Sequence, residues 1–284
     1  MAELLRGAPV ASSLTEELSY RTSVLRSRGI EPTLAIVRVG ERSDDLAYER
    51  GAMKRAERVG LTVQRILLPA DCVQEELMAA IERVNADASV HGCLMFSPLL
   101  SHLDEAAARA ALDASKDVDG ITPGSLFGLY AREAVGFAPC TAEAVVELLD
   151  RSGVALEGSR VCVVGRSLVI GRPVSLMLQD RNATVTMCHT RTRNLAEECR
   201  RADVLVVAAG HAGTIGADCV SSGQVVVDVG INWDDEAGRL VGDVAFEEVE
   251  PLVRAITPVP GGVGAVTTAV LAKHVVEAAE RASA

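Results

Sequence analysis

Two glycines in the segment 161–173 could shape a phosphate-binding turn. The sequence VCVVGRSLVIGRP places an apolar run before Gly165, and Gly171 follows six residues later at the start of a helix-like pattern. Gly165 permits a tight turn from strand to helix, and Arg166 and Ser167 add side-chain donors beside a helix N-terminus, which attracts anions. The spacing is not G-x-G-x-x-G, so an ordinary glycine-containing turn explains the segment about equally well.

The end of the next apolar run bears on the choice of cofactor. Enzymes that use NAD commonly have an acidic residue about 20 residues after the first glycine, where it binds the ribose hydroxyls. This chain has Cys188, His189, Thr190 and Arg191 there, and no acid. Because Arg191 and Arg166 match the charge of a 2′-phosphate, these residues favour NADP, with NAD as the alternative.

Two further loops combine polar or rigid residues. Asp117 and Asp119 flank a valine in SKDVDGITP (115–123), a pattern that is also typical of solvated turns. The segment ITPVPGGVGAVT (256–267) carries prolines and glycines that break regular structure, directly before a helix. A stiff loop of this kind exposes its backbone, so a ligand can approach it closely; a plain linker is the alternative.

Apolar runs alternate with helix-period segments along the whole chain, which predicts an α/β fold built on mostly parallel sheets. In the first half we expect strands over 33–39, 61–68 and 91–96, with helices over 44–59 and 73–85. In the second half we expect strands over 160–164, 184–188, 204–208 and 224–230, at a spacing of roughly 20 residues that is typical of a dinucleotide-binding domain. Helices over 142–150 and 266–282 complete the pattern.

Composition and charge exclude several classes of protein. At about 150 residues per domain, 284 residues suggest two domains, and 49% hydrophobic residues are ordinary for a globular protein. The net charge of −11 without a basic cluster argues against nucleic-acid binding. We expect no membrane association and a cytoplasmic location, because the chain has no secretory signal and no apolar run of ~20 residues. The seven cysteines contain no C-x-x-C, so we expect buried thiols and no metal site.

Nine ordered segments make the sequence similar to the methylenetetrahydrofolate dehydrogenase/cyclohydrolase family. They are VHGCLMFSPL (90–99), KDVDGITP (116–123), FAPCTAEAV (137–145), VVGRSLVIGRP (163–173), TVTMCHTRT (184–192), ADVLVVAAG (202–210), VVDVGIN (226–232), GDV (242–244) and ITPVPGGVG (256–264). The resemblance implies a three-layer α/β folate-binding catalytic domain over 1–140 plus 266–284, and a Rossmann-like NADP-binding domain over 141–265. It also implies a cleft between the domains and a homodimer.

The resemblance further implies roles for individual residues. Asp119 would anchor the pterin ring of a folate substrate, and the catalytic positions would be Tyr48, Asp119 and Asp45. The cofactor would contact Gly165, Arg166, Ser167, Gly171, Thr190, Arg191 and Ile231. The folate would contact Tyr48, Phe96, Pro98, Asp119, Pro260, Gly261, Gly262 and Thr267.

Three polar positions of the family's site differ in this chain. The family carries Ser-x-x-Tyr-x-x-x-Lys on the helix after the first strand, and a Gln before the proline turn that follows residue 96. This chain keeps Tyr48, but it has Asp45, Ala52 and Phe96 at the positions of the Ser, the Lys and the Gln. Lys54 is no replacement, because it lies about 200° around the helix from position 52. Asp45 could serve as a carboxylate in the site or belong to the helix cap.

These departures predict an NADP-dependent methylenetetrahydrofolate dehydrogenase whose cyclohydrolase activity is weak or absent. Hydride transfer needs chiefly the positioning of two bound rings, whereas ring opening by water needs a group that can handle a proton. One alternative is a fully bifunctional enzyme in which Asp45 or Tyr48 activates the water. A second is a non-catalytic protein that binds folate or a nucleotide.

Overall fold

The computed structural model describes residues 1–235 and 238–283, and the chain divides into two compact units. The three-stranded unit comprises Ser12–Cys140 with Thr268–Ala284, and the six-stranded unit comprises Met1–Ala11 with Thr141–Thr267. The sequence-based boundaries of 1–140 plus 266–284 and 141–265 differ from this division mainly at the N-terminus. The first residues join the second unit because strand β1 (Glu3–Leu4) pairs in parallel with β11 (Ala255–Ile256).

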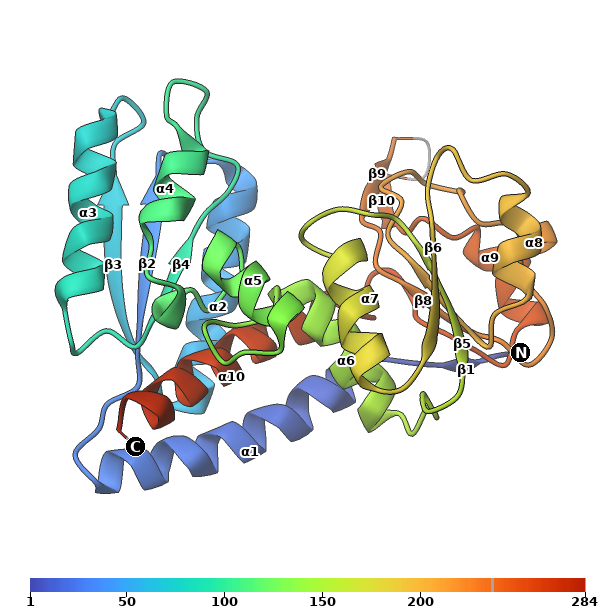
Figure 1. Cartoon of the computed structure of the whole chain (residues 1–284), viewed down its shortest axis with the longest axis horizontal. Helices are drawn as coiled ribbons and strands as arrows, with labels where there is room; N and C mark the ends of the chain where they lie inside the picture. The colour runs from blue at the N-terminus through green and yellow to red at the C-terminus, as the bar shows by residue number, and fades with distance from the viewer. Residues whose placement is uncertain (236–237, 284) are drawn as a thin grey trace. The chain divides into compact units, whose positions relative to one another are not determined.

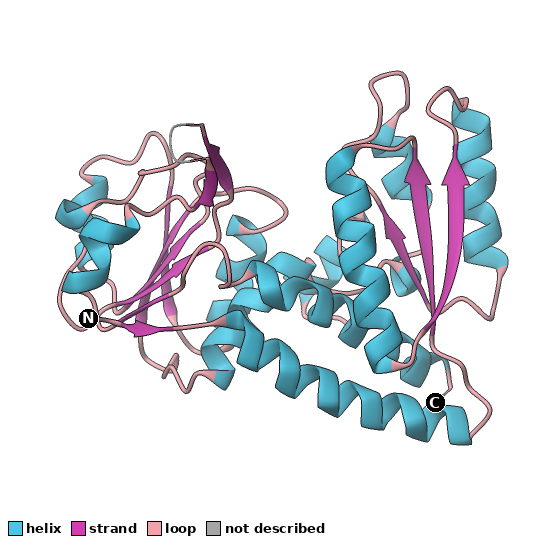
Figure 2. Ribbon diagram, turned by 180° about the vertical axis from the view of Figure 1, so that it is seen from behind, coloured by secondary structure: helices cyan, strands magenta, loops and turns pink. Residues whose placement is uncertain are grey.

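The three-stranded unit is built on a parallel sheet with helices on both faces (Figure 2). Its strands lie in the order β3 (Thr62–Leu68), β2 (Thr33–Val39), β4 (Gly92–Met95). Every residue of β2 is buried, as expected for a central strand covered on both faces. One face packs on α3 (Gln74–Ala86) and α4 (Glu105–Ala111) through a core that includes Val37, Leu77 and Ala108. The other helices of this unit are α2 (Ser43–Val59), α5 (Pro123–Ala131) and most of α1 (Gly7–Ser27) and α10 (Gly264–Ala282).

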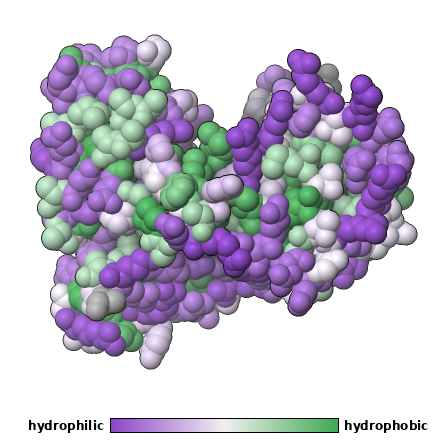
Figure 3. All heavy atoms as spheres, in the orientation of Figure 1, coloured by the Kyte–Doolittle hydropathy of each residue, from purple (hydrophilic) through white to green (hydrophobic). Residues whose placement is uncertain are grey.

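The helix α1 was not predicted from the sequence. Its apolar residues Leu14, Leu18 and Leu25 are buried, whereas most of the residues between them are polar, with several serines and threonines. Serine and threonine compete for backbone hydrogen bonds and give little helix signal. The outward face of α1, at the lower edge of Figure 3, is largely hydrophilic.

The six-stranded unit has a parallel sheet in the order β1-β11-β8-β7-β5-β6 (Figure 1). The predicted strands appear as β5 (Arg160–Val164), β6 (Thr184–Cys188), β7 (Val204–Val207) and β8 (Val225–Asp228). The helices are α6 (Cys140–Arg151), α7 (Gly171–Asp180), α8 (Leu195–Arg200) and the short α9 (Phe246–Val249). A separate antiparallel pair joins β9 (Asn232–Asp234) and β10 (Arg239–Val241). Parallel strands place all their carboxyl ends at one edge, where ligands of such folds bind.

Two global features of the described residues bear on the predictions. All seven cysteines of the chain lie in this part, and each is buried and outside any disulfide, which agrees with the prediction of mostly reduced, buried thiols. No helix within residues 1–235 and 238–283 combines the length and the apolar character that crossing a bilayer requires.

Candidate functional site

The turn between β5 and α7 is as tight as the glycines predicted. Gly165 has a φ of +133°, and a Cβ there would lie 2.2 Å from the Ala208 carbonyl oxygen. A Cβ on Gly171 would lie 2.3 Å from the Gly165 carbonyl oxygen. The hydroxyl oxygen of Ser167 accepts a hydrogen bond from the Ile170 N–H at 3.1 Å, which orders the entry into α7. Both positions therefore need glycine, because the chain's own backbone leaves no room for a Cβ there.

Residues that follow β6 lie beside this turn. The Gly165 N–H donates to the Cys188 carbonyl at 2.9 Å, so the loops after the two strands start side by side. Arg166, Thr190 and Arg191 are exposed there. A tight glycine turn, a helix N-terminus and two exposed arginines fit a phosphorylated dinucleotide. The proposed cofactor residues at 165–171 and 190–191 thus come together at one sheet edge.

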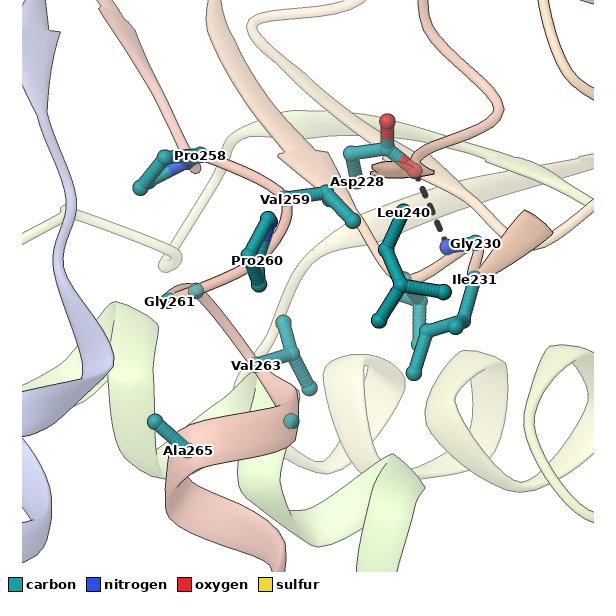
Figure 4. Close-up of a pocket in the computed structure, with 13 residues that line it drawn as sticks. Asp228, Gly230, Ile231, Leu240, Pro258, Val259, Pro260, Gly261, Val263 and Ala265 are labelled. Atoms are coloured by element: carbon teal, nitrogen blue, oxygen red, sulfur yellow. Dashed lines mark hydrogen bonds between the residues drawn. The ribbon is translucent and has the colours of Figure 1, made fainter. Parts of the chain in front are cut away.

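A cavity of about 340 Å³ lies in the same unit, between the end of β8 and the proline-glycine loop. Figure 4 shows the side chains of Ile231, Leu240, Pro260 and Val263 around this space. Gly261 and Gly262 also line it, so the predicted loop residues meet Ile231 here. Thr267 is not among the described lining residues, and its hydroxyl donates to the Val263 carbonyl at 3.4 Å.

A buried carboxylate that sequence reasoning gave no role holds this region together. Asp228, at the end of β8, accepts hydrogen bonds from the N–H groups of Gly230, Asp243 and Val244 at 2.9–3.0 Å (Figure 4 shows the first). A Cβ on Gly242 would lie 1.9 Å from Asp228 Oδ2. Burial raises the pKa of Asp228 to about 6, and the three N–H donors oppose that rise. The motifs VVDVGIN and GDV are therefore tied to each other through one side chain.

In the three-stranded unit, Tyr48 and Phe96 face one another. Their ring centroids are 5.9 Å apart and the planes are nearly perpendicular, at 86°. Burial raises the pKa of Tyr48 well above its ordinary value, and the negative charge of Asp119 raises it further. The Tyr48 hydroxyl therefore stays protonated at neutral pH and is a donor rather than a base.

The helix face that carries Tyr48 holds no amine. Ala52 lies one turn further along α2 and is 2% exposed, while Lys54 is exposed on another face, as the helical geometry predicted. Asp45 is 7% exposed, and Arg42 Nε lies 3.9 Å from its Oδ2. Burial raises the pKa of Asp45, and the positive charge of Arg42 opposes that rise.

The two aspartates of the KDVDGITP segment have different surroundings. Asp117 is fully buried and accepts hydrogen bonds from the N–H groups of Gly120, Ile121 and Thr122, so it forms the turn without being solvated. Asp119 is half-buried, and burial followed by the charge of Asp117 raises its pKa to about 6. Asp119 is thus the carboxyl group near Tyr48 that can change protonation close to neutral pH.

Pro98 and the buried ion pairs of Glu49 complete the surroundings of α2. Pro98 is exposed, and its carbonyl accepts a hydrogen bond from Arg42 Nη1 at 2.7 Å. Glu49 is 4% exposed and is held by the Nε atoms of Arg38 at 2.7 Å and Arg65 at 2.6 Å. The sequence alone did not predict these buried ion pairs, because Glu49 stands in the pattern of an ordinary polar helix residue.

Comparisons with known proteins agree with both halves of this description. The model of the tetrahydrofolate dehydrogenase/cyclohydrolase catalytic domain matches residues 5–119, and the model of the family's NAD(P)-binding domain matches residues 139–283. The chain belongs to the tetrahydrofolate dehydrogenase/cyclohydrolase family. It is 51% identical over 281 residues to the bifunctional protein FolD of Carboxydothermus hydrogenoformans, covering 99% of this chain and 98% of that one.

Solved structures of this family have the same fold. The bifunctional FolD enzyme of Campylobacter jejuni matches with a TM-score of 0.95 and 38% identity over 99% of both chains. The Trypanosoma brucei enzyme, solved with NADP cofactor and an inhibitor, matches with a TM-score of 0.91 and 36% identity over 99% of this chain and 98% of that chain. The family, its α/β fold with a Rossmann-like NAD(P)-binding domain and the dehydrogenase assignment are therefore confirmed. Within the described ranges, no three His, Cys, Asp or Glu side chains are grouped to hold a metal ion.

Proposed function

We propose that this member of the family is a 5,10-methylenetetrahydrofolate dehydrogenase that uses NADP and hydrolyses its product slowly or not at all. The observation that carries the proposal is the pair Ala52 and Phe96. Neither side chain can give or accept a proton, and both are buried beside Tyr48 on α2 and at the end of β4. The proposal assigns folate binding to the three-stranded unit and NADP binding to the six-stranded unit.

Two side chains support folate binding in the three-stranded unit. The ionised carboxylate of Asp119 can accept hydrogen bonds from the N–H groups of a pterin ring. The Tyr48 hydroxyl, which stays protonated, can donate one to the substrate. Phe96 holds the Tyr48 ring edge-on, which limits its rotation. These contacts position the methylene carbon, and positioning is the main demand of hydride transfer.

The six-stranded unit supplies the contacts for NADP. The N–H groups at the start of α7 and the side chains of Arg166, Ser167 and Arg191 would hold the phosphates. When bound, the oxidised nicotinamide supplies the acceptor for the hydride that leaves the methylene carbon. The folate product is then a methenyl cation, and the transfer releases no proton. The side chains of Ile231, Leu240 and Val263 give the cavity beside this site an apolar lining.

Hydrolysis makes a different demand. Water must add to the methenyl cation, and one proton must leave the attacking water before the ring opens. General acid or base help contributes typically about 10²–10⁴-fold, which is roughly 3–5 kcal/mol of barrier. Ala52 and Phe96 provide no such help, and the protonated Tyr48 cannot act as the base. We therefore expect the rate of hydrolysis to be lower by about 10²–10⁴-fold.

A second candidate is the fully bifunctional enzyme. Relatives such as the Carboxydothermus protein are named bifunctional, and Asp45 offers a buried carboxylate on the same helix face as Tyr48. Because its pKa is raised by burial, Asp45 is a stronger base than an exposed aspartate. The positive charge of Arg42 lowers the pKa of Asp45 and so makes it a weaker base. We therefore favour the dehydrogenase with weak or absent hydrolysis.

Purified protein assayed separately for oxidation and for hydrolysis of the methenyl compound tests the proposal. We expect oxidation with NADP and hydrolysis slower by at least about 100-fold. Substituting Ala52→Lys together with Phe96→Gln should raise hydrolysis, whereas Lys54→Gln, on the exposed face of the same helix, should change neither rate. Loss of hydrolysis in Asp45→Asn would instead support the bifunctional enzyme.

The cytoplasmic location and the homodimer are also part of the proposal, on the strength of the family resemblance alone. Sedimentation equilibrium of the purified protein tests the dimer, and a monomer at micromolar concentration would remove it.

A further inference from the structure

A buried histidine lies behind the peptide that carries Asp119. His274, on α10, is 1% exposed, and its Nδ1 lies 2.8 Å from the carbonyl oxygen of Val118. Cys140 Sγ donates to the same carbonyl at 3.2 Å and lies 3.7 Å from His274 Nδ1. The Cys140 N–H donates to the Asp119 carbonyl at 3.3 Å. Two side chains that are distant in sequence therefore converge on the Val118–Asp119 peptide.

The hydrogen-bond partners fix the state of the His274 ring. A carbonyl oxygen can only accept, so Nδ1 carries a hydrogen and donates it to Val118. The Phe137 ring stacks on the imidazole, with centroids 4.8 Å apart at 29°, and the Arg281 guanidinium lies 4.2 Å from the Phe137 centroid. This stack holds the imidazole in one orientation, so its N–H points steadily at the Val118 carbonyl.

The other side of the Asp119 peptide is fixed by packing. Gly120 has a φ of +73°, and a Cβ there would lie 2.4 Å from the Ala138 carbonyl carbon. The Asp117 carboxylate binds the N–H groups of the three residues after Asp119. The Val118 N–H donates to the Lys116 carbonyl at 2.9 Å, and the Val118 carbonyl is held by His274 on α10 together with Cys140.

We propose that His274 is a positioning residue for Asp119: its imidazole holds the Val118–Asp119 peptide so that the Asp119 carboxylate meets the folate. The proposal rests on the proposed function, because it takes Asp119 to be the group that binds the substrate. His274 does not touch the substrate in this account. It acts through the Val118 carbonyl, and a positive charge on the ring would lower the pKa of Asp119.

Charged and titratable groups surround Asp119 on several elements. Asp117 lies in its own loop, Tyr48 on α2, Cys140 at the start of α6, Arg109 on α4 and His274 on α10. Burial and Asp117 raise the pKa of Asp119, whereas the Cys140 hydrogen bond and the charges of His274 and Arg109 lower it. Removing the imidazole therefore raises the pKa of Asp119 further, and less of it is ionised in weakly acidic solution.

Two substitutions separate the hydrogen bond from the charge. His274→Asn can place an amide N–H near the position of Nδ1, so it retains the donor and loses the charge. His274→Leu loses both. We expect His274→Leu to raise the KM for the folate about tenfold, the effect of one lost hydrogen bond of about 1.4 kcal/mol. His274→Asn should restore the KM at pH 8 to within about threefold of the wild type.

Both variants should move the acidic limb of the pH profile of kcat/KM for the folate to higher pH. The binding constant for NADP should stay unchanged in both, which shows that the six-stranded unit is intact. His102→Asn is the matched control in the same unit, because His102 contacts the Cys72 carbonyl and no group of the Asp119 cluster. It should leave the KM and the pH profile at their wild-type values.

Two outcomes would overturn the proposal. One is a folded His274→Leu protein with wild-type folate KM and pH profile. The other is an equal loss in His274→Leu and His274→Asn with no change in the pH profile, which means that the imidazole only fills space. Failure of the proposed function would look different, because the wild type would then lack dehydrogenase activity or Asp119→Asn would retain it.

Discussion

Replacing Asp119 by Asn should stabilise the protein while it weakens folate binding. Folding raises the pKa of Asp119 from its ordinary value of 3.8 to about 6. An acid whose pKa is raised on folding destabilises the folded state above that pKa, and the cost fades as the pH falls toward the unfolded value. The relevant window for Asp119 is therefore pH 6 down to pH 4.

The size of the effect follows from the pKa difference. At about 1.4 kcal/mol per pH unit, the ionised carboxylate costs up to about 3 kcal/mol at pH 8. Asp119 is half-buried, so solvent reduces this to about 1–2 kcal/mol. At about 2–4 °C per kcal/mol for a chain of this size, Asp119→Asn should raise the melting temperature by about 3–6 °C at pH 8. At pH 4.5 the gain should fall to about a third.

Differential scanning calorimetry of the wild type and Asp119→Asn at pH 8 and pH 4.5 measures this directly. Asp71→Asn is the matched control, because Asp71 is exposed in the same unit, and its melting temperature should follow that of the wild type at both pH values. A variant that is less stable than the wild type at pH 8, or a difference that is the same at both pH values, would refute the reasoning.

Three further predictions concern the six-stranded unit. Asp228→Asn should destabilise the protein by about 1–3 kcal/mol in urea unfolding, because its one oxygen can accept from the Gly230 and Asp243 N–H groups while its NH2 group faces the Val244 N–H, which loses its acceptor; unchanged stability would contradict this. Gly165→Ala should abolish NADP binding in calorimetric titration, since its Cβ would collide with the Ala208 carbonyl, and binding at the wild-type affinity would exclude that account. Arg191→Ala should raise the KM for NADP by about 10–100-fold and leave that for NAD unchanged, whereas equal changes would mean that Arg191 contacts no 2′-phosphate.

The strands and helices with a clear period could be predicted from the sequence. The predicted strand over 33–39 is confirmed residue for residue by β2, because a nearly continuous apolar run suits a strand buried on both faces, and its one charged residue, Arg38, is paired with Glu49. The helix over 44–59 agrees with α2 to within one residue. The two residues of β1 carry no period, and only the free edge of β11 makes them a strand.

The candidate site could be predicted only where a local motif carries it. Gly165 and Gly171 can be recognised in the sequence because their backbone positions demand glycine. His274 cannot be recognised in this way, since 155 positions separate it from Asp119 and the chain around it is an ordinary helix. Asp228 belongs to a recognisable segment, yet its role depends on a second segment that folds back onto it. Long-range contacts of this kind have no signature in a single sequence.

The central claim is that oxidation and hydrolysis are uncoupled in this protein, and the fate of the product tests it most directly. The purified enzyme is given methylenetetrahydrofolate and NADP, and NADPH, the methenyl compound and 10-formyltetrahydrofolate are measured over the same time course. We predict one methenyl compound for each NADPH, with 10-formyltetrahydrofolate forming no faster than in enzyme-free buffer. Formation of 10-formyltetrahydrofolate in step with NADPH would contradict the claim.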